Sequence, residues 1–164
     1  MTRIIDNRTL TMADTLSQEI PLINDVAIAS AYFNVRGFSL IKDTLKDKKL
    51  RFLLGKEPQS NVAYRDEILS ELENEVVENE DDMKFFKEVK DAVEYFSKDY
   101  TQVKIVKDGF FHGKVYMGAS PSLQSIRQGF GITGSSNFTY SGLTSNMELN
   151  MLATDREAVE ELSK

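Results

Sequence analysis

The chain has 164 residues, 41% of them hydrophobic and 28% charged, which predicts a single compact domain with an apolar core. It has no cysteine, so disulfides, thiolate metal sites and a cysteine nucleophile are excluded. No apolar run reaches the roughly 18 residues of a membrane span, and the polar N-terminal segment lacks the apolar centre of a signal peptide. We therefore expect a cytoplasmic protein without a membrane partner.

The net charge of -6 is distributed unevenly along the chain. Residues 66–99 hold thirteen of the 26 acidic residues and four of the 20 basic ones, so this segment carries -9 and the remainder +3. An acidic protein does not ordinarily bind nucleic acid, because lysine and arginine hold the phosphates. Here the acidity belongs to one segment, and the rest of the chain keeps a small excess of basic residues.

The first predicted elements alternate between helix and strand. Apolar spacing predicts a helix at Met12–Glu19, a buried strand at Asp25–Phe33, a helix at Gly37–Leu45 and a second strand at Lys48–Gly55. A strand, a helix and a second strand in this order indicate a parallel pair of strands.

Two groups of apolar residues at helical spacing predict a pair of amphipathic helices in the acidic segment. The first group is Ile68, Leu69, Leu72 and Val76, and the second is Phe85, Phe86, Val89, Val93 and Phe96. We interpret the pair as surface helices with a solvated acidic face, and the alternative is a surface that binds a partner.

Short strands follow the acidic segment. Thr101–Lys107 alternates as a half-buried strand does, and Asp108–Gly109 is a tight-turn signal, so Phe110–Met117 is expected to return antiparallel beside it. Further strands are predicted at Gly129–Gly134 and Asn146–Thr154.

The order of elements predicts an α/β protein, and we expect a sandwich around a mixed, largely parallel sheet. One domain is expected over residues 1–164. A last helix, predicted from residue 155 onward, looks cut short at Lys164, so we expect an N-terminal fragment of a longer protein.

The only histidine of the chain lies two residues before a lysine, in the sequence FFHGKVYMG. The alternation of a strand would point His112 and Lys114 to the same side. An imidazole can act as a nucleophile or an acid near neutral pH, and an ammonium suits a phosphoryl oxygen. The pair therefore indicates a phosphate site, although a histidine considered alone is more often an ordinary surface or core residue.

A second polar segment lies at Gly134–Asn137. Its backbone N–H groups and hydroxyls can hold an anion, and Ser135 and Asn137 would be neutral donors to a phosphodiester. The alternative is an ordinary polar turn that caps a helix, where serine and asparagine are common.

Together these two segments resemble the signature of the phospholipase D superfamily, a histidine and a lysine two residues apart followed by Gly-Ser-x-Asn. The continuation NFTYSGLTSNMELN is similar to that of single-motif members, which include bacterial endonucleases and helicase-associated domains. The segments IASAYFNVRGFSLI and LRFLLG are also similar, so the resemblance covers most of the chain. It implies a phospholipase D-like α/β/α sandwich and a place beside a C-terminal helicase or ATPase domain.

One position departs from the family pattern. Many members carry an aspartate five residues after the lysine, where this chain has Ala119. In single-motif nucleases that aspartate is often missing, and the resemblance implies that Glu148 orients the nucleophilic His112 instead. We therefore do not interpret Ala119 as inactivating.

The resemblance also implies a mechanism. His112 would attack phosphorus to give a phosphohistidine, while Lys114, Ser135 and Asn137 stabilise the phosphoryl oxygens, with no metal and no cofactor. The family gives proton transfer to a second histidine, which this chain lacks. Either a second copy of the chain supplies its own His112 at a two-fold interface, or an undetermined tyrosine or lysine acts, and we expect a homodimer with a composite site.

The leading hypothesis is a metal-independent DNA nuclease module. The second is a dimerising DNA-binding module of a helicase or restriction system with little catalysis, and a phospholipid phosphodiesterase ranks below both because no basic amphipathic helix is visible. Several lysines outside the acidic segment could form a track for the phosphate backbone, or they could be scattered solubilising charge. They are Lys46, Lys48, Lys49, Lys104 and Lys107.

Overall fold

The computed structural model of the chain describes residues 2–55, 83–107, 111–120 and 129–162. The first predicted acidic helix lies outside these residues, as does the predicted tight turn at Asp108–Gly109.

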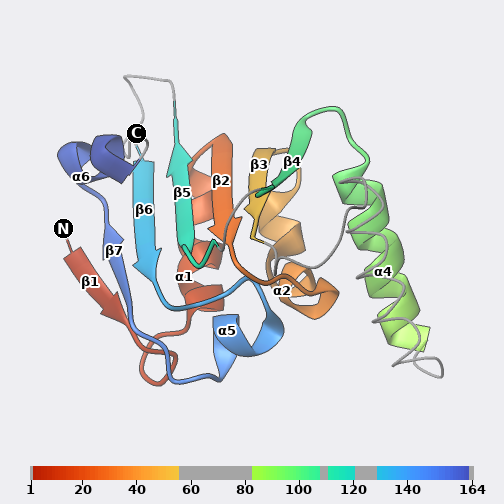
Figure 1. Cartoon of the computed structure of the whole chain (residues 1–164), viewed down its shortest axis with the longest axis horizontal. Coiled ribbons are helices and arrows are strands. Elements are labelled where there is room, and N and C mark those ends of the chain that lie inside the picture. Colours follow the sequence, from red (N-terminus) through yellow and green to blue (C-terminus); the bar gives the residue numbers. More distant parts are fainter. Residues whose placement is uncertain (1, 56–82, 108–110, 121–128, 163–164) are drawn as a thin grey trace.

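Seven strands of the described residues form one sheet in the order β1-β7-β6-β5-β2-β3-β4 (Figure 1). The strands are β1 (Thr2–Ile5), β2 (Asp25–Ser30), β3 (Lys49–Leu54), β4 (Thr101–Ile105), β5 (Val115–Ala119), β6 (Gly129–Gly134) and β7 (Asn150–Ala153). The parallel pairs are β2 with β3 and β3 with β4, as the strand-helix-strand pattern predicts.

The other four pairs of the sheet are antiparallel. The predicted α/β class and mixed sheet are therefore confirmed, and the expectation of a largely parallel sheet is wrong. After β4 the chain passes to the other side of β2, and β5, β6 and β7 then reverse direction from one neighbour to the next. Reversals of this kind build antiparallel ladders, whereas parallel ladders need long crossovers.

The predicted hairpin between Thr101–Lys107 and Phe110–Met117 is also wrong. Strand β5 pairs with β2 and β6, while β4 pairs with β3. Tyr116 in the middle of β5 is only 1% exposed. A place between β2 and β6 covers this large ring, which a place at the sheet edge beside β4 would not do, and burial of an aromatic side chain outweighs a local turn signal.

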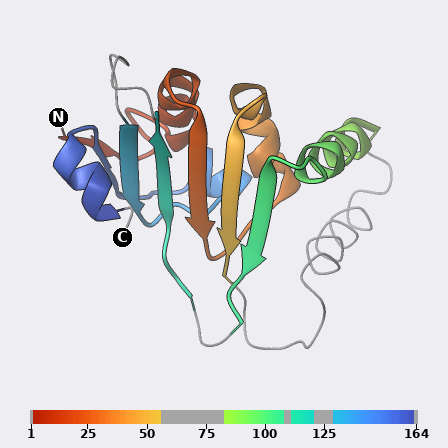
Figure 2. The same ribbon diagram turned by 90° about the horizontal axis from the view of Figure 1, so that it is seen from above.

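Helices cover the sheet unevenly. They are α1 (Met12–Glu19), a short 3₁₀ helix η1 (Ile20–Leu22), α2 (Val35–Leu45), α4 (Met83–Phe96), α5 (Tyr140–Thr144) and α6 (Arg156–Leu162). Figure 2 shows α1 and α2 on one side of the sheet and α6 on the other, where it packs against β6. Among the described residues, α6 forms the helical layer on the second face of the sheet. No helix that they form is long and apolar enough to cross a membrane.

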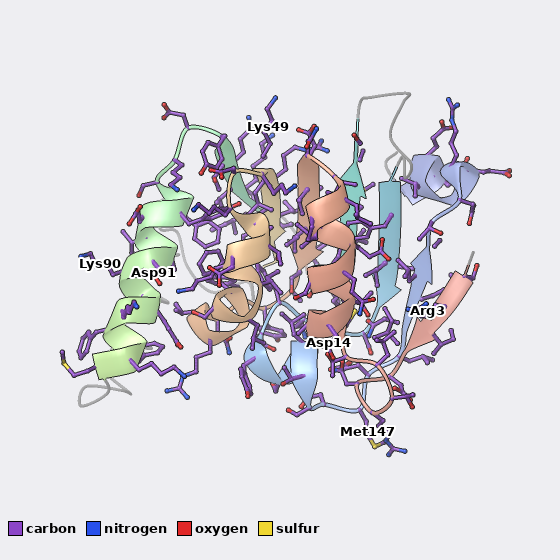
Figure 3. All side chains as sticks on the ribbon, turned by 180° about the vertical axis from the view of Figure 1, so that it is seen from behind. Arg3, Asp14, Lys49, Lys90, Asp91 and Met147 are labelled. Carbon is purple, nitrogen blue, oxygen red and sulfur yellow. The ribbon has the colours of Figure 1, made fainter. Side chains whose placement is uncertain are left out.

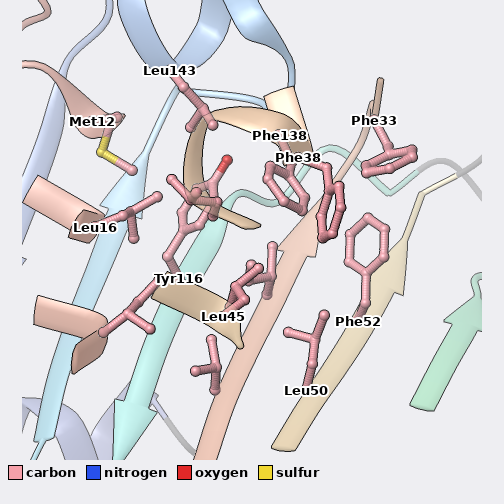
Figure 4. Close-up of a cluster of buried hydrophobic side chains, with 14 of the residues drawn as sticks. Met12, Leu16, Phe33, Phe38, Leu45, Leu50, Phe52, Tyr116, Phe138 and Leu143 are labelled. Atoms are coloured by element: carbon pink, nitrogen blue, oxygen red, sulfur yellow. The ribbon is translucent and has the colours of Figure 1, made fainter. Parts of the chain in front are cut away.

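The core lies between the sheet and the helices α1, α2 and α4. Rings of Phe33, Phe52 and Phe138 meet with centroids 5.4–5.6 Å apart, and Tyr116 lies beside them (Figure 4). Each such buried ring contributes on the order of 1.5–3 kcal/mol by leaving water. Phe33 follows β2, Phe138 follows β6, and the two residues form a parallel β-bridge. This packing joins the two loops that carry polar site residues.

Candidate active site

The predicted site residues come together at one end of the sheet, the lower end in Figure 1. The loops that carry them follow β2 and β6 or precede β5 and β7. Val115, the first residue of β5, pairs with Ala29 on one side and Thr133 on the other, and Gly134 N donates to Lys114 O at 3.4 Å. Register in the sheet therefore places the two sequence motifs next to each other.

His112 and Lys114 lie in the segment before β5, and their side chains meet as predicted. The imidazole is exposed, whereas Lys114 is 4% exposed. Its Nζ lies 2.7 Å from Nδ1 and 2.9 Å from Nε2 of His112, and it donates to the backbone O of His112 at 2.8 Å. The contact brings a positive charge within hydrogen-bonding distance of the imidazole, and the donor and acceptor roles depend on which ring nitrogen carries the proton.

Two opposing effects act on the Lys114 ammonium. Burial lowers the pKa of Lys114 below its usual value, and the negative charge of Glu148 raises it. A buried cation is stable only where partners replace water, which the oxygen and ring of His112 do here. The ammonium is consequently a desolvated charge beside the imidazole, where attraction to a phosphoryl oxygen is stronger than in water.

Hydrogen bonds to buried side chains anchor the Gly134–Asn137 segment. Ser136 is fully buried, its N donates to Asn150 Oδ1 at 3.1 Å, and its Oγ accepts from Asn150 Nδ2 at 2.8 Å. Its carbonyl oxygen accepts from Tyr116 Oη at 3.0 Å. Burial raises the pKa of Tyr116, so the phenol stays protonated and remains a donor. These bonds hold the segment in one conformation.

Glycine is required where this segment leaves β6. A Cβ on Gly134 would lie 2.3 Å from Leu149 O and 2.5 Å from Asn150 Oδ1, closer than a Cβ can approach either atom. The close approach lets the end of β6 lie beside the start of β7, and it keeps Asn150 within reach of Ser136.

The amide of Asn137 is oriented by the loop after β2. Its Oδ1 accepts from Tyr32 N at 3.3 Å and lies 3.4 Å from Ser30 Oγ. Ser30 Oγ in turn accepts from Phe138 N at 2.8 Å. Because the oxygen end of the amide is engaged, the two N–H donors of Asn137 are the end left for a ligand.

Ser135 and Glu148 form a short hydrogen bond in which Ser135 Oγ donates to Glu148 Oε2. Ser135 Oγ also accepts from Leu149 N at 2.9 Å, and Glu148 Oε1 accepts from Asn146 Nδ2 at 3.4 Å. Glu148 therefore orients Ser135 directly and acts on Lys114 through its charge. The expectation that it orients His112 stays a prediction.

Ala119, at the position where many relatives have an aspartate, is the last residue of β5. It lies four residues beyond Val115, about 13 Å away at the usual rise of a strand. The departure from the family pattern is thus at the opposite end of β5 from His112 and leaves the described site contacts intact.

The basic residues do not form one track. Lys104 lies near the end of β4 at the same end of the sheet as the site, and Lys107 follows it. The segment Lys46–Lys49 lies at the opposite end, where Lys49 pairs with Asp25. Lys48 Nζ donates to Ile23 O at 2.6 Å, a structural contact.

Sequence reasoning missed three anchoring residues, Ser30, Tyr116 and Asn150. Asn150 is 2% exposed and points inward from the start of β7. A polar residue at an inward-facing strand position was the available signal, because such a group needs a buried partner. Its partner in the Gly134–Asn137 segment could not be inferred without the pairing of β6 with β7.

The site thus combines an exposed imidazole, a desolvated ammonium, a hydroxyl and an oriented amide, a set suited to a phosphoryl group. Among the described residues, no group of three or more histidine or carboxylate side chains is arranged to hold a metal ion.

Comparison with known proteins agrees with this chemistry. The family model described as "Cardiolipin synthase, PLD-like domain" matches residues 24–164. No curated protein matches the chain. The solved structure of NucT from Helicobacter pylori superposes with a TM-score of 0.58 at 14% identity, covering 99% of this chain and 91% of that one.

Two further structures share the fold. Nuc from Salmonella typhimurium, a phospholipase D family member, superposes with a TM-score of 0.59 at 11% identity, covering 99% of this chain and 89% of that one. A polyphosphate kinase from Porphyromonas gingivalis gives 0.58 at 11% identity, covering 99% of this chain and 25% of that one. At these identities the likenesses concern the fold. Since the family model spans most of the chain and all of the candidate site, the chain belongs to the phospholipase D-like family, a superfamily of phosphodiesterases and nucleases.

Proposed function

We propose that the chain is a metal-independent phosphodiesterase that cleaves DNA through a phosphohistidine at His112. The observation that carries the proposal is the contact of Lys114 Nζ with the ring nitrogens of His112 at 2.7 and 2.9 Å. This contact places the imidazole that would attack beside a positive charge for the oxygens of the phosphodiester.

The reaction then has two displacements. An unprotonated ring nitrogen of His112 attacks phosphorus, the bond from phosphorus to the leaving oxygen breaks, and that oxygen takes a proton from a general acid. Water, deprotonated by the same group acting as a base, next attacks the phosphohistidine and releases both the histidine and the second product. No oxidant, reductant or cofactor enters either step.

Charge on the phosphoryl oxygens grows in each displacement and needs fixed donors. Lys114 and the amide of Asn137 are assigned this role, and Ser135 joins them when its hydroxyl proton turns from Glu148 to a phosphoryl oxygen. Donors that are already oriented stabilise such charge without reorganisation, and the loss of one typically lowers kcat on the order of 10²–10³-fold. The buried bonds of Ser136 to Asn150 and Tyr116 support the proposal, because they preorganise this segment.

The general acid is proposed to be His112 of a second copy of the chain in a homodimer. The chain contains one histidine, and the two proton-transfer steps call for a second group that titrates near neutral pH. Large exposed apolar side chains next to the site support an interface between copies, namely Tyr32, Met147 and Leu149 at 44%, 76% and 66% exposure.

The dimer is tested by sedimentation of the purified chain together with activity across a dilution series. We expect a dimer whose activity per chain falls where the dimer dissociates. A monomer that cleaves DNA with unchanged single-turnover kinetics would show instead that a tyrosine or lysine of the same chain supplies the proton.

The substrate proposal rests on the likeness to structures whose names identify nucleases, NucT and Nuc, and it extends beyond the fold that they share. Attachment to a helicase or ATPase stays a prediction from the sequence resemblance.

The test is incubation of the protein with labelled single- and double-stranded DNA in excess EDTA. A His112→Ala variant reports on the nucleophile, and a Lys90→Ala variant, which changes an exposed residue of α4, serves as the control. We expect EDTA-resistant cleavage by the native chain and by the control variant, and none by His112→Ala. Binding without cleavage, unchanged by His112→Ala, would favour a recognition module with little catalysis.

A further inference from the structure

A concave surface separate from the active site lies behind the sheet, where α2, α4 and α5 meet. It is a groove of about 470 Å³. The residues that line it and matter here are Arg36, Ser39 and Lys42 of α2, Lys84 and Glu88 of α4, and Tyr140 of α5. Figure 3 shows α2 and α4 side by side in this region, with Asp91 of α4 labelled. None of the residues assigned above to catalysis lines this groove.

The walls of the groove carry more positive than negative charge. Among the described residues that line it, Arg36, Lys42 and Lys84 outnumber the one carboxylate, Glu88. Lys84 is 86% exposed, and its Nζ lies 4.0 Å from Glu88 Oε1, the limit for an ion pair, so this contact contributes little energy. Lys42 pairs with Asp91, which raises the pKa of Lys42 and keeps it charged.

Two further features suit an anion. The guanidinium of Arg36 lies 5.4 Å from the ring centroid of Phe85, which restricts the long side chain at the edge of the groove. Ser39 Oγ is, within the described part of the chain, the one buried side-chain oxygen or nitrogen atom without a hydrogen-bond partner. A buried hydroxyl without a partner is unfavourable, and a bound anion would supply an acceptor after a rotation of the side chain.

A neighbouring groove shows that this charge balance is not general to α2 and α4. It measures about 290 Å³ and shares Lys42 with the first groove. The other charged residues that line it are Lys46, Lys98, Asp43, Asp91 and Glu94. Among the described residues that line it, three cations and three carboxylates balance, so they offer a phosphate no net attraction.

The cationic groove is connected to the active site by short, fixed contacts. Tyr140 follows Asn137 by three residues, which is at most about 10 Å of chain. Asn34 Oδ1 accepts from Gly37 N at 2.8 Å and from Tyr140 N at 3.0 Å, which ties the start of α2 to the start of α5. A Cβ on Gly37 would lie 2.7 Å from the backbone of Thr139, so the two helices meet closely.

We propose that this groove binds the sugar-phosphate backbone of the nucleic acid strand next to the phosphodiester held at His112. The inference rests on the proposed function and adds a second phosphate-binding subsite to it. Successive phosphates follow one another about every 3.4 Å along a duplex strand, so a groove with one lining residue, Tyr140, at most about 10 Å from Asn137 begins within a few nucleotides of the reacting phosphate. Arg36 and Lys84 contact that backbone, and Lys42 adds its charge from within its ion pair.

The test compares two double variants of equal charge. Arg36→Gln/Lys84→Gln removes two cations from the groove, and Lys87→Gln/Lys90→Gln removes two exposed cations of α4 that lie outside the groove lining. Binding of a fluorescent oligonucleotide is measured by anisotropy against salt concentration, in a His112→Ala background that prevents cleavage. Hydrolysis of bis(p-nitrophenyl) phosphate, which is small enough to occupy the His112 site alone, is measured with His112 intact.

For the groove variant, we expect the Kd for the oligonucleotide to rise about tenfold and the salt slope to fall by about 1.4, the value for two contacts to a single strand. The control should stay within about twofold of the parent, and hydrolysis of the small substrate should be unchanged in both. Lys84→Gln alone, at an exposed position, should give about half of the slope change, which guards against misfolding of the double variant.

Equal losses of affinity in the two double variants, or no loss in either, would overturn the groove assignment. A native chain that fails to cleave DNA, combined with the expected loss of affinity in the groove variant alone, would overturn the proposed catalysis and leave the groove standing as a phosphate-binding surface.

Discussion

The two halves of the active site are held in different ways. His112 and Lys114 precede β5 and contact each other, with the imidazole exposed. The Gly134–Asn137 segment is fastened to the core through Ser30, Tyr116 and Asn150. The nucleophile is therefore accessible, whereas the donors that stabilise charge are rigid, as preorganised electrostatic catalysis requires. A substitution of the exposed His112 should alter activity alone, and substitutions of the residues that anchor the Gly134–Asn137 segment should alter stability as well.

The largest effect is expected from His112→Gln. It should lower kcat/KM at least about 10³-fold because it removes the nucleophile, and it should change the free energy of unfolding by less than about 0.5 kcal/mol, as is usual at exposed positions. Steady-state kinetics and urea denaturation of the same preparation measure both quantities. Substantial remaining activity, or a clear loss of stability, would remove the distinction between the two halves.

Asn150→Ala should lower both stability and activity. It leaves Ser136 N without its buried acceptor, which costs on the order of 1–3 kcal/mol in the free energy of unfolding. The freed segment should lower kcat about 10- to 100-fold as its donors lose their orientation. Asn24→Ala, at an exposed asparagine before β2, is the control for denaturation and kinetics and should change neither. A stable Asn150→Ala variant with native kcat would show that the segment needs no anchor.

The smallest effect is a shift in pH dependence that links the two halves. Catalysis that needs a charged Lys114 falls as pH rises through the pKa of that ammonium, which burial holds below 10.5. Glu148→Gln removes a negative charge that raises this pKa, so the alkaline limb of kcat/KM should move to lower pH. Glu157→Gln, an exposed acid of α6, should leave the limb in place. An unchanged limb, or one moved to higher pH, would contradict the assignment of Lys114.

Local patterns in the sequence predicted the elements better than their pairing. The helix at Met12–Glu19 and the strand at Gly129–Gly134 have the predicted bounds, because a helical apolar stripe and flanking glycines are properties of neighbouring residues. The strands β1 and β5 show the limit of prediction from local sequence patterns. β1 was not predicted because its residues carry no clear alternation, and β5 was placed beside the wrong strand because pairing depends on distant residues.

The residues of the site likewise divide into those that local sequence patterns predict and those that depend on tertiary contacts. The pair of His112 and Lys114 could be found from its spacing and from the family pattern, which needs no knowledge of the fold. Ser30 and Asn150 could not, since each acts through a residue far away in the chain, Phe138 and Ser136 respectively. The partner of Glu148 was likewise set by tertiary structure, which brings its carboxylate to Ser135.

The most direct test is to trap the covalent intermediate. The protein is mixed with an oligonucleotide that carries an internal ³²P label, quenched in alkali within milliseconds, digested, and the labelled peptide identified. A phosphohistidine at His112 that forms before product, is stable in alkali, is lost in acid and is absent from His112→Gln is the expected result. Product formation without any covalent label, or a label that persists in His112→Gln, would contradict nucleophilic catalysis by His112.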